Sequence, residues 1–148
     1  MRREFTSLVD RGVFEPAILP PGRKAIGVRW CYAYKYAPDG IILTSKEKAR
    51  LVALGYLQGL DDYGKTYAPV AKLVSIRTVL AYANFKGWHI YTYDVKTAFL
   101  NAPLSHVIYC KNIPGFPLPG AGPEHNSMLV KQAIYGLWQS SREFYLFL

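Results

Sequence analysis

The fold of this chain is decided by residues 88–95, which read Trp88-His89-Ile90-Tyr91-Thr92-Tyr93-Asp94-Val95. β-Branched and aromatic side chains dominate the stretch and favour a strand. Asp94 is the only acidic residue between Asp62 and Glu124. Burying an ionised carboxylate without a partner is costly, so the sequence predicts a strand whose one acid needs a cation, hydrogen bonds or a proton.

Asp94 has two readings from the residues alone. A Mg²⁺ ion at the end of the strand would satisfy it, because Mg²⁺ takes oxygen ligands and often uses one or two protein carboxylates plus substrate phosphates. Alternatively, Asp94 forms a salt bridge with Lys96 or caps the helix that follows. Both remain open at this point.

The segments around this stretch alternate between helical and extended patterns. Apolar residues recur at helical spacing from Leu73 to Lys86, and Gly87 supplies a stop signal. A second helical start is expected at 96–101 and a short strand at 107–110. A Pro- and Gly-rich loop covers 112–126, and residues 128–148 predict a strand, a turn at 135–136 and a helix.

The upstream half predicts a short helix at 4–11 and then a long basic hairpin. Large residues fill every second position from Val28 to Tyr36, Pro38-Asp39-Gly40 is a turn signal, and the extended pattern resumes through Val52. Residues 23–50 contain two acidic residues and seven basic ones: Arg23, Lys24, Arg29, Lys35, Lys46, Lys48 and Arg50. Such a lobe suits a polyanion, although a solvated basic face would have the same composition.

Composition sets the class of protein. The chain has 148 residues, of which 51% are hydrophobic and 19% charged, so it is not a disordered chain and can form one core or one lobe. No apolar run approaches the roughly 20 residues that span a bilayer, and the start lacks a secretory signal. We expect an α+β protein, with a basic β-hairpin and helices packed on a small antiparallel sheet. It should be intracellular, cytoplasmic or nuclear, and neither secreted nor bound to a membrane.

Five strings, in register, carry a resemblance to a known family. Residues 94–101, Asp94-Val95-Lys96-Thr97-Ala98-Phe99-Leu100-Asn101, resemble the first catalytic motif of Ty1/copia-type retrotransposon reverse transcriptases. The other strings are Lys48-Ala49-Arg50-Leu51-Val52-Ala53 with Gly55-Tyr56 and Gln58, Asp62-Tyr63 with Thr66, Ala68-Pro69-Val70 and Ile76-Arg77, Ile108-Tyr109 with Pro114-Gly115-Phe116, and Tyr135-Gly136-Leu137 with Gln139. The match covers most of the chain.

The resemblance implies a partial reverse transcriptase domain over residues 1–148, with fingers at about 23–87 and the first part of a palm at 88–148. It implies RNA-directed DNA polymerisation on an RNA or DNA template-primer with deoxynucleoside triphosphates. Two Mg²⁺ ions would align the primer hydroxyl with the nucleotide phosphate.

The resemblance also assigns roles to six residues. Asp94 would be catalytic as a metal ligand, with the backbone carbonyl of Val95 beside it. Lys48 and Arg50 would meet the triphosphate, or be solvated hairpin charges. Phe99 would pack against the sugar, or belong to the core, and Gln139 would line the nucleotide pocket.

The sequence also departs from the family pattern. Leu54 and Trp138 stand where the family usually has Lys, and Ser141 where it has Pro. A Tyr-x-Asp-Asp motif is expected beyond Leu148, and one carboxylate cannot hold two Mg²⁺ ions, so we expect the chain alone to be inactive. The alternatives are a non-catalytic basic nucleic-acid-binding module and an unstable remnant of a decayed element.

Overall fold

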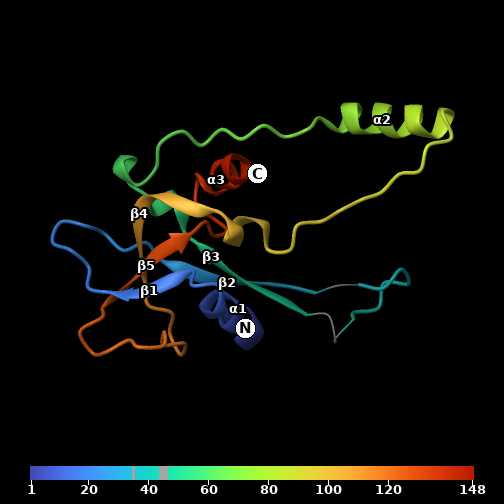
Figure 1. Cartoon of the computed structure of the whole chain (residues 1–148). Coiled ribbons are helices and arrows are strands. Elements are labelled where there is room, and N and C mark those ends of the chain that lie inside the picture. Colours follow the sequence, from blue (N-terminus) through green and yellow to red (C-terminus); the bar gives the residue numbers. More distant parts are fainter. Residues whose placement is uncertain (35, 44–46) are drawn as a thin grey trace.

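The computed structural model describes residues 1–34, 36–43 and 47–148, so Lys35 and Lys46 of the predicted basic hairpin lie outside the described residues. The chain mixes helices with two small antiparallel sheets, which confirms the expected α+β class (Figure 1). In chain order the elements are α1 (Arg2–Asp10), β1 (Phe14–Ala17), β2 (Val28–Ala33), β3 (Lys48–Ala53), the 3-10 turns η2 (Gly55–Leu57) and η3 (Leu60–Asp62), α2 (Leu73–Phe85), the 3-10 turn η4 (Ala98–Asn101), β4 (Pro103–Lys111), β5 (Ser127–Gln132) and α3 (Ser140–Phe147).

The predicted hairpin is confirmed as the pair β2–β3. The strands are antiparallel, with Val28 opposite Ala53 and Ala33 opposite Lys48. Gly40 closes the predicted turn with φ of 83°, a left-handed conformation that glycine adopts without strain. The hairpin therefore forms where alternation and turn chemistry place it.

The second sheet has the strand order β1–β5–β4 and joins the two ends of the chain. Phe14 pairs with Val130, and Ile108 pairs with Val130 from the other side. The expected strands near 107–110 and 128 are confirmed, although β4 begins earlier, at Pro103. β1 was not predicted, because it is short, contains Pro16 and depends on a partner more than a hundred positions away in the sequence.

The core lies between this sheet, α1 and the base of the hairpin. Leu8 from α1, Leu51 from β3 and Ile134 after β5 are each almost completely buried. Trp30 places its ring 5.4 Å from that of Phe116, which joins the hairpin to the 112–126 loop. The remaining fully buried large side chains include Val13, Ile108, Cys110 and Met128.

Backbone hydrogen bonds fasten the hairpin to the larger sheet. Ile26 donates to the Tyr109 carbonyl at 2.8 Å, and Ala53 donates to the Tyr135 carbonyl at 2.8 Å. A Cβ on Gly136 would lie 2.1 Å from the Ala53 carbonyl oxygen, and one on Gly55 would lie 2.0 Å from the Gly136 oxygen. This contact therefore requires glycine at both positions.

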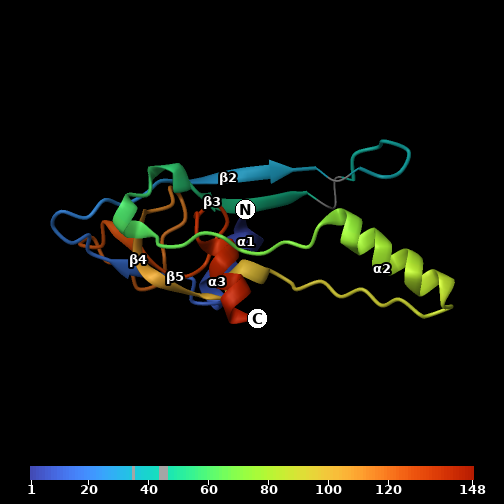
Figure 2. The ribbon, with the colours of Figure 1, turned by 90° about the horizontal axis from the view of Figure 1, so that it is seen from above.

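Residues 65–97, which we call the arm, leave the body and return to it. Figures 1 and 2 show α2 at the far end of two extended segments, on the same side as the hairpin tip. The predicted helix is confirmed, but the expectation that it packs on a sheet is wrong, because Ala83 is its only buried residue. Within the described residues no helix is long and apolar enough to cross a membrane.

The strand predicted at 88–95 is also wrong. These residues form no regular secondary structure, and their side chains are exposed. Strand formation needs a neighbour that accepts and donates backbone hydrogen bonds, and no described segment pairs with this stretch. The helical start at 96–101 appears only as the short turn η4.

Candidate functional site

Among the paired residues of β2 and β3, one face of the hairpin carries three cations and no acid. In an antiparallel pair, directly opposed residues share a face, and so do alternate residues of each strand. Arg29, Cys31 and Ala33 of β2 oppose Val52, Arg50 and Lys48 of β3. This set of six residues, which we call the basic face, has no acidic member, whereas the opposite face turns Trp30 and Leu51 to the core.

Arg50 connects the basic face to an aromatic cluster. Its guanidinium carbon lies 5.1 Å from the centroid of the Tyr135 ring, a distance suited to a cation–π contact. The Tyr135 ring lies 5.1 Å from the Phe99 ring, and Phe99 in turn lies 6.1 Å from Phe144. The structure thus brings Arg50 and Phe99 together through Tyr135, which the sequence placed in a turn and in a family string without giving its side chain a role.

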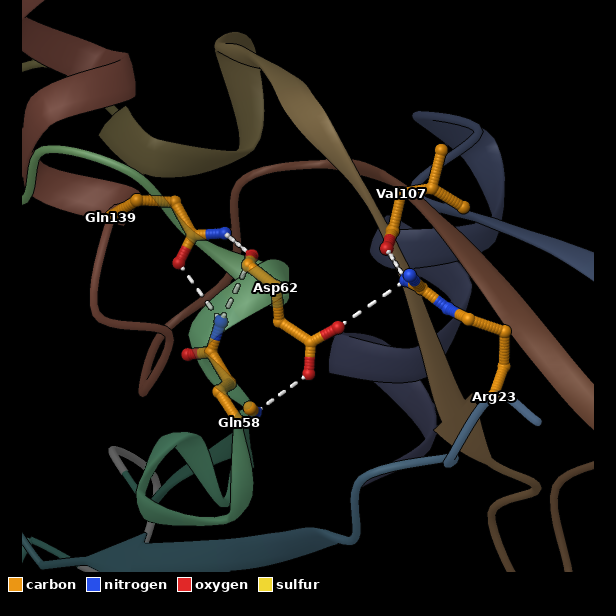
Figure 3. A network of polar contacts seen from close by, with 6 residues as sticks. Arg23, Gln58, Asp62, Val107 and Gln139 are labelled. Carbon is orange, nitrogen blue, oxygen red and sulfur yellow. Dashed lines mark hydrogen bonds and ion pairs between the residues drawn. The ribbon is translucent and has the colours of Figure 1, made fainter.

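Gln139 lies in a buried amide network rather than in an open pocket (Figure 3). Only 1% of the residue is exposed. Gln58 Nε2 donates to Gln139 Oε1 at 3.0 Å, and Gln139 Nε2 donates to the Asp62 carbonyl at 3.1 Å. Gln58 Oε1 also accepts from the backbone N–H of Trp138 at 3.0 Å. Gln58 belongs to the family string that begins at Lys48, but nothing in the sequence indicated that it hydrogen-bonds to Gln139.

Arg23 extends the network to the larger sheet. Its Nη2 lies 3.2 Å from Asp62 Oδ1 and also donates to the Val107 carbonyl of β4 (Figure 3). Asp62 Oδ2 accepts from the Gly59 N–H at 2.9 Å. Arg23 was counted with the hairpin charges, yet this ion pair gives it a structural role between η3 and β4.

Asp94 and Val95 stand apart from these contacts. Both side chains are exposed in the extended segment between α2 and η4. The ion pairs formed by described residues do not include Asp94, so the salt bridge to Lys96 is not formed. Thr97, not Asp94, is the N-cap of η4. Among residues 1–34, 36–43 and 47–148, no three His, Cys, Asp or Glu side chains cluster as metal ligands.

The charges of the basic face also act on α1. Burial raises the pKa of Glu4 above its usual value, and the positive charges of Arg50 and Lys48 partly offset this rise. Lys48 itself is exposed, and Arg50 is half-buried. On the basic face, solvent therefore reaches Lys48 freely and Arg50 only in part.

Residues 12–148 match the family described as Reverse transcriptase (RNA-dependent DNA polymerase), and the chain belongs to this family. The resemblance to Ty1/copia-type reverse transcriptases is confirmed as well by curated relatives. The Retrovirus-related Pol polyprotein from transposon TNT 1-94 of Nicotiana tabacum is 34% identical over 147 residues, which are 99% of this chain and 11% of that protein.

Two relatives come from Arabidopsis thaliana. The Pol polyprotein from transposon RE1 is 42% identical over 149 residues, covering 99% of this chain and 10% of the relative. The Pol polyprotein from transposon RE2 is 41% identical over 129 residues, which are 86% of this chain and 8% of the relative. The chain thus spans about a tenth of the length of these relatives. No solved structure gives a significant match.

Proposed function

We propose that this chain supplies the fingers, at about residues 23–87, and the first part of the palm, at 88–148, of an RNA-directed DNA polymerase in a Ty1/copia-type Pol polyprotein. Its substrates there are a template-primer and deoxynucleoside triphosphates. The observation that carries the proposal is the contact of Arg50 with Tyr135 and of Tyr135 with Phe99, beside exposed Lys48 on the same face.

This arrangement suits the two ends of a nucleotide. Lys48 and Arg50 offer positive charge to a triphosphate, where cations offset the charge that develops during phosphoryl transfer. Phe99, held against Tyr135, offers a flat apolar wall to the sugar. Gln139 contributes to the nucleotide pocket indirectly, by holding the surrounding backbone in place, because its amide group is already hydrogen-bonded to Gln58 and Asp62.

Asp94 and the Val95 carbonyl are proposed as metal ligands, with Mg²⁺ as the expected cofactor. The donor set of the described residues does not fit a two-metal site, because Asp94 is one exposed carboxylate without acidic or histidine neighbours in a cluster. Two divalent ions need more oxygen ligands than this. In the complete polymerase, Asp94 would therefore share the ions with carboxylates from elsewhere.

Nucleotide binding tests the proposal directly. Photo-crosslinking of radiolabelled dTTP to the purified chain should be weakened several-fold by Lys48→Ala and by Arg50→Ala. Lys111→Ala, an exposed lysine on β4, is the matched control and should leave labelling unchanged. Equal labelling of all four proteins would refute the assignment of Lys48 and Arg50.

Primer extension tests the proposed inactivity of the chain alone. With an RNA template, a DNA primer, deoxynucleotides and Mg²⁺, we expect no extension, because the metal ligands are incomplete. Robust incorporation that disappears in Asp94→Asn would overturn this part of the proposal while supporting the role of Asp94.

The acid-free basic face favours one second candidate, a non-catalytic nucleic-acid-binding module. Its affinity should fall steeply with salt, because each neutralised phosphate releases counterions. Charge reversal at Lys48 and Arg50 should weaken binding, and circular dichroism checks that each variant remains folded. If these reversals weaken oligonucleotide binding and leave dTTP labelling unchanged, the module is favoured over the polymerase fragment. A chain that melts without a cooperative transition would instead be the unstable remnant.

A further inference from the structure

A groove of about 350 Å³ lies where the base of the hairpin meets the turn after β5. It is lined by residues 52–56 and 136–138 together with Arg29. No described residue that lines it is acidic, and Arg29 belongs to the basic face. The groove therefore continues the positive surface of the hairpin into a concave site.

Two large aromatic rings are presented at this groove. Tyr56 is 71% exposed and Trp138 is 54% exposed. The Tyr63 ring supports Trp138 at 6.4 Å, with a tilt of 34° between the rings. Exposed aromatic rings beside a cation are the groups on which nucleic-acid bases stack.

The polar network described above fixes the position of Trp138. The backbone N–H of Trp138 donates to Gln58 Oε1. The next two residues, Gln139 and Ser140, are buried. The glycine contact between residues 136 and 53 holds the start of the same turn against β3. The backbone that carries the Trp138 ring is thus ordered before any ligand arrives, which lowers the entropic cost of binding.

We propose that this groove binds a single-stranded nucleic acid by stacking an unpaired base on Trp138 and Tyr56 while Arg29 contacts a phosphate. The inference rests on the proposed function and deepens it, because it assigns the unpaired template to a particular surface.

Fluorescence anisotropy with labelled single-stranded oligo(dT) and oligo(U) tests this inference on the full chain. Trp138→Ala and Tyr56→Ala should each weaken binding roughly 5- to 100-fold, whereas Trp138→Phe should retain most of the affinity. Arg29→Ala should lower the slope of log affinity against log salt by about one, and Trp138→Ala should leave that slope unchanged.

Trp88→Ala is the matched control, because Trp88 is 61% exposed on the arm, outside the groove. It should bind oligonucleotides like the unsubstituted chain. Circular dichroism and urea unfolding verify that each variant remains folded, as expected for side chains exposed to this degree.

The outcomes separate this inference from the proposed function. Unchanged oligonucleotide affinity in folded Trp138→Ala and Tyr56→Ala proteins overturns the groove, even if Lys48 and Arg50 still govern dTTP labelling. Equal affinity for duplex and single strands overturns it too, because paired bases cannot stack on the rings. If no variant loses dTTP labelling but oligonucleotide binding depends on Trp138, the groove proposal is supported and the nucleotide site is refuted.

Discussion

Gln58 connects the η3 turn to residues 138–139 through one side chain. Its amide contacts the Trp138 backbone, the Gln139 side chain and, at 3.5 Å, the Asp62 carbonyl. Hydrogen bonds made away from water matter chiefly because their loss leaves a partner unsatisfied. The aromatic turn at 135–138 therefore depends on an amide that lies some eighty positions earlier in the sequence.

Truncation of Gln139 should be destabilising. Gln139→Ala removes the hydrogen bonds that Gln139 makes with Gln58 Nε2 and with the Asp62 carbonyl and leaves only the 3.5 Å contact between those two groups, at a cost of about 1–3 kcal/mol. Urea denaturation measures this change. Gln132→Leu is the control, because Gln132 Oε1 is buried without a hydrogen-bond partner, so its removal should not lower stability. Equal losses in both variants would contradict the network.

Glu4 should make stability depend on pH. Its pKa is raised by burial, so the folded state binds the proton more tightly than the unfolded state. The stabilising contribution is complete below the unfolded value, near 4.5, and is lost as pH rises through the higher folded value. Glu4→Gln should therefore raise the melting temperature at pH 7 and leave it nearly unchanged at pH 4. A lower melting temperature for Glu4→Gln at pH 7 would contradict the assigned sign.

Individual elements were predictable where local signals decide them. The hairpin follows from alternation and the Pro38-Asp39-Gly40 turn, and α2 follows from its spacing and from Gly87. The stretch 88–95 has the residues of a strand but lacks a partner, and strand propensity reflects packing against neighbours rather than backbone preference alone. β1 shows the converse, since pairing with β5 makes a strand of a short segment that contains proline.

The residues of the candidate site also fall into those that local sequence predicts and those that only the fold brings together. Lys48 and Arg50 fall on one face because strand periodicity is local, so their proximity was predictable. The contact of Arg50 with Tyr135 depends on how the hairpin docks on the larger sheet, and no spacing encodes that docking. Likewise, Gln139 matched a motif by sequence, but only the fold shows that Gln58 and Asp62 occupy its amide.

α2 should tolerate polar substitution far better than the core does. Val79 is 66% exposed on α2, whereas Leu51 is 3% exposed on β3. Val79→Glu should change the free energy of unfolding by less than about 0.5 kcal/mol, and Leu51→Ala should cost about 2–5 kcal/mol. Urea unfolding compares the two. Val79→Glu should also reduce light scattering, because exposed apolar surface promotes association. A large loss of stability in Val79→Glu would mean that α2 packs on the body.

At the scale of the whole molecule, stability should be uneven. The three-stranded sheet and α1 share the buried core, whereas the arm contributes almost nothing to it. A helix of 13 residues without tertiary packing is marginal in water. The body should therefore remain folded while α2 unfolds and refolds locally.

Hydrogen exchange should separate these two regions. Amides of residues 70–97 should exchange within seconds to minutes at neutral pH, while those of β4 and β5 should be protected by close to the global unfolding free energy. Mass spectrometry of exchanged peptides measures both regions in one sample. Protection of the arm equal to that of β5 would contradict its isolation.

The excursion of the arm makes this chain divisible. A protease that nicks residues 65–97 would release neither flank, because β1 pairs with β5 and Ile26 bridges to Cys110 across the cut. Separately expressed halves ending near 64 and starting near 98 would share one interrupted sheet and could reassemble as a complementing pair. The same topology makes the arm the natural place to insert a foreign domain, since α2 already stands clear of the packed body (Figure 2).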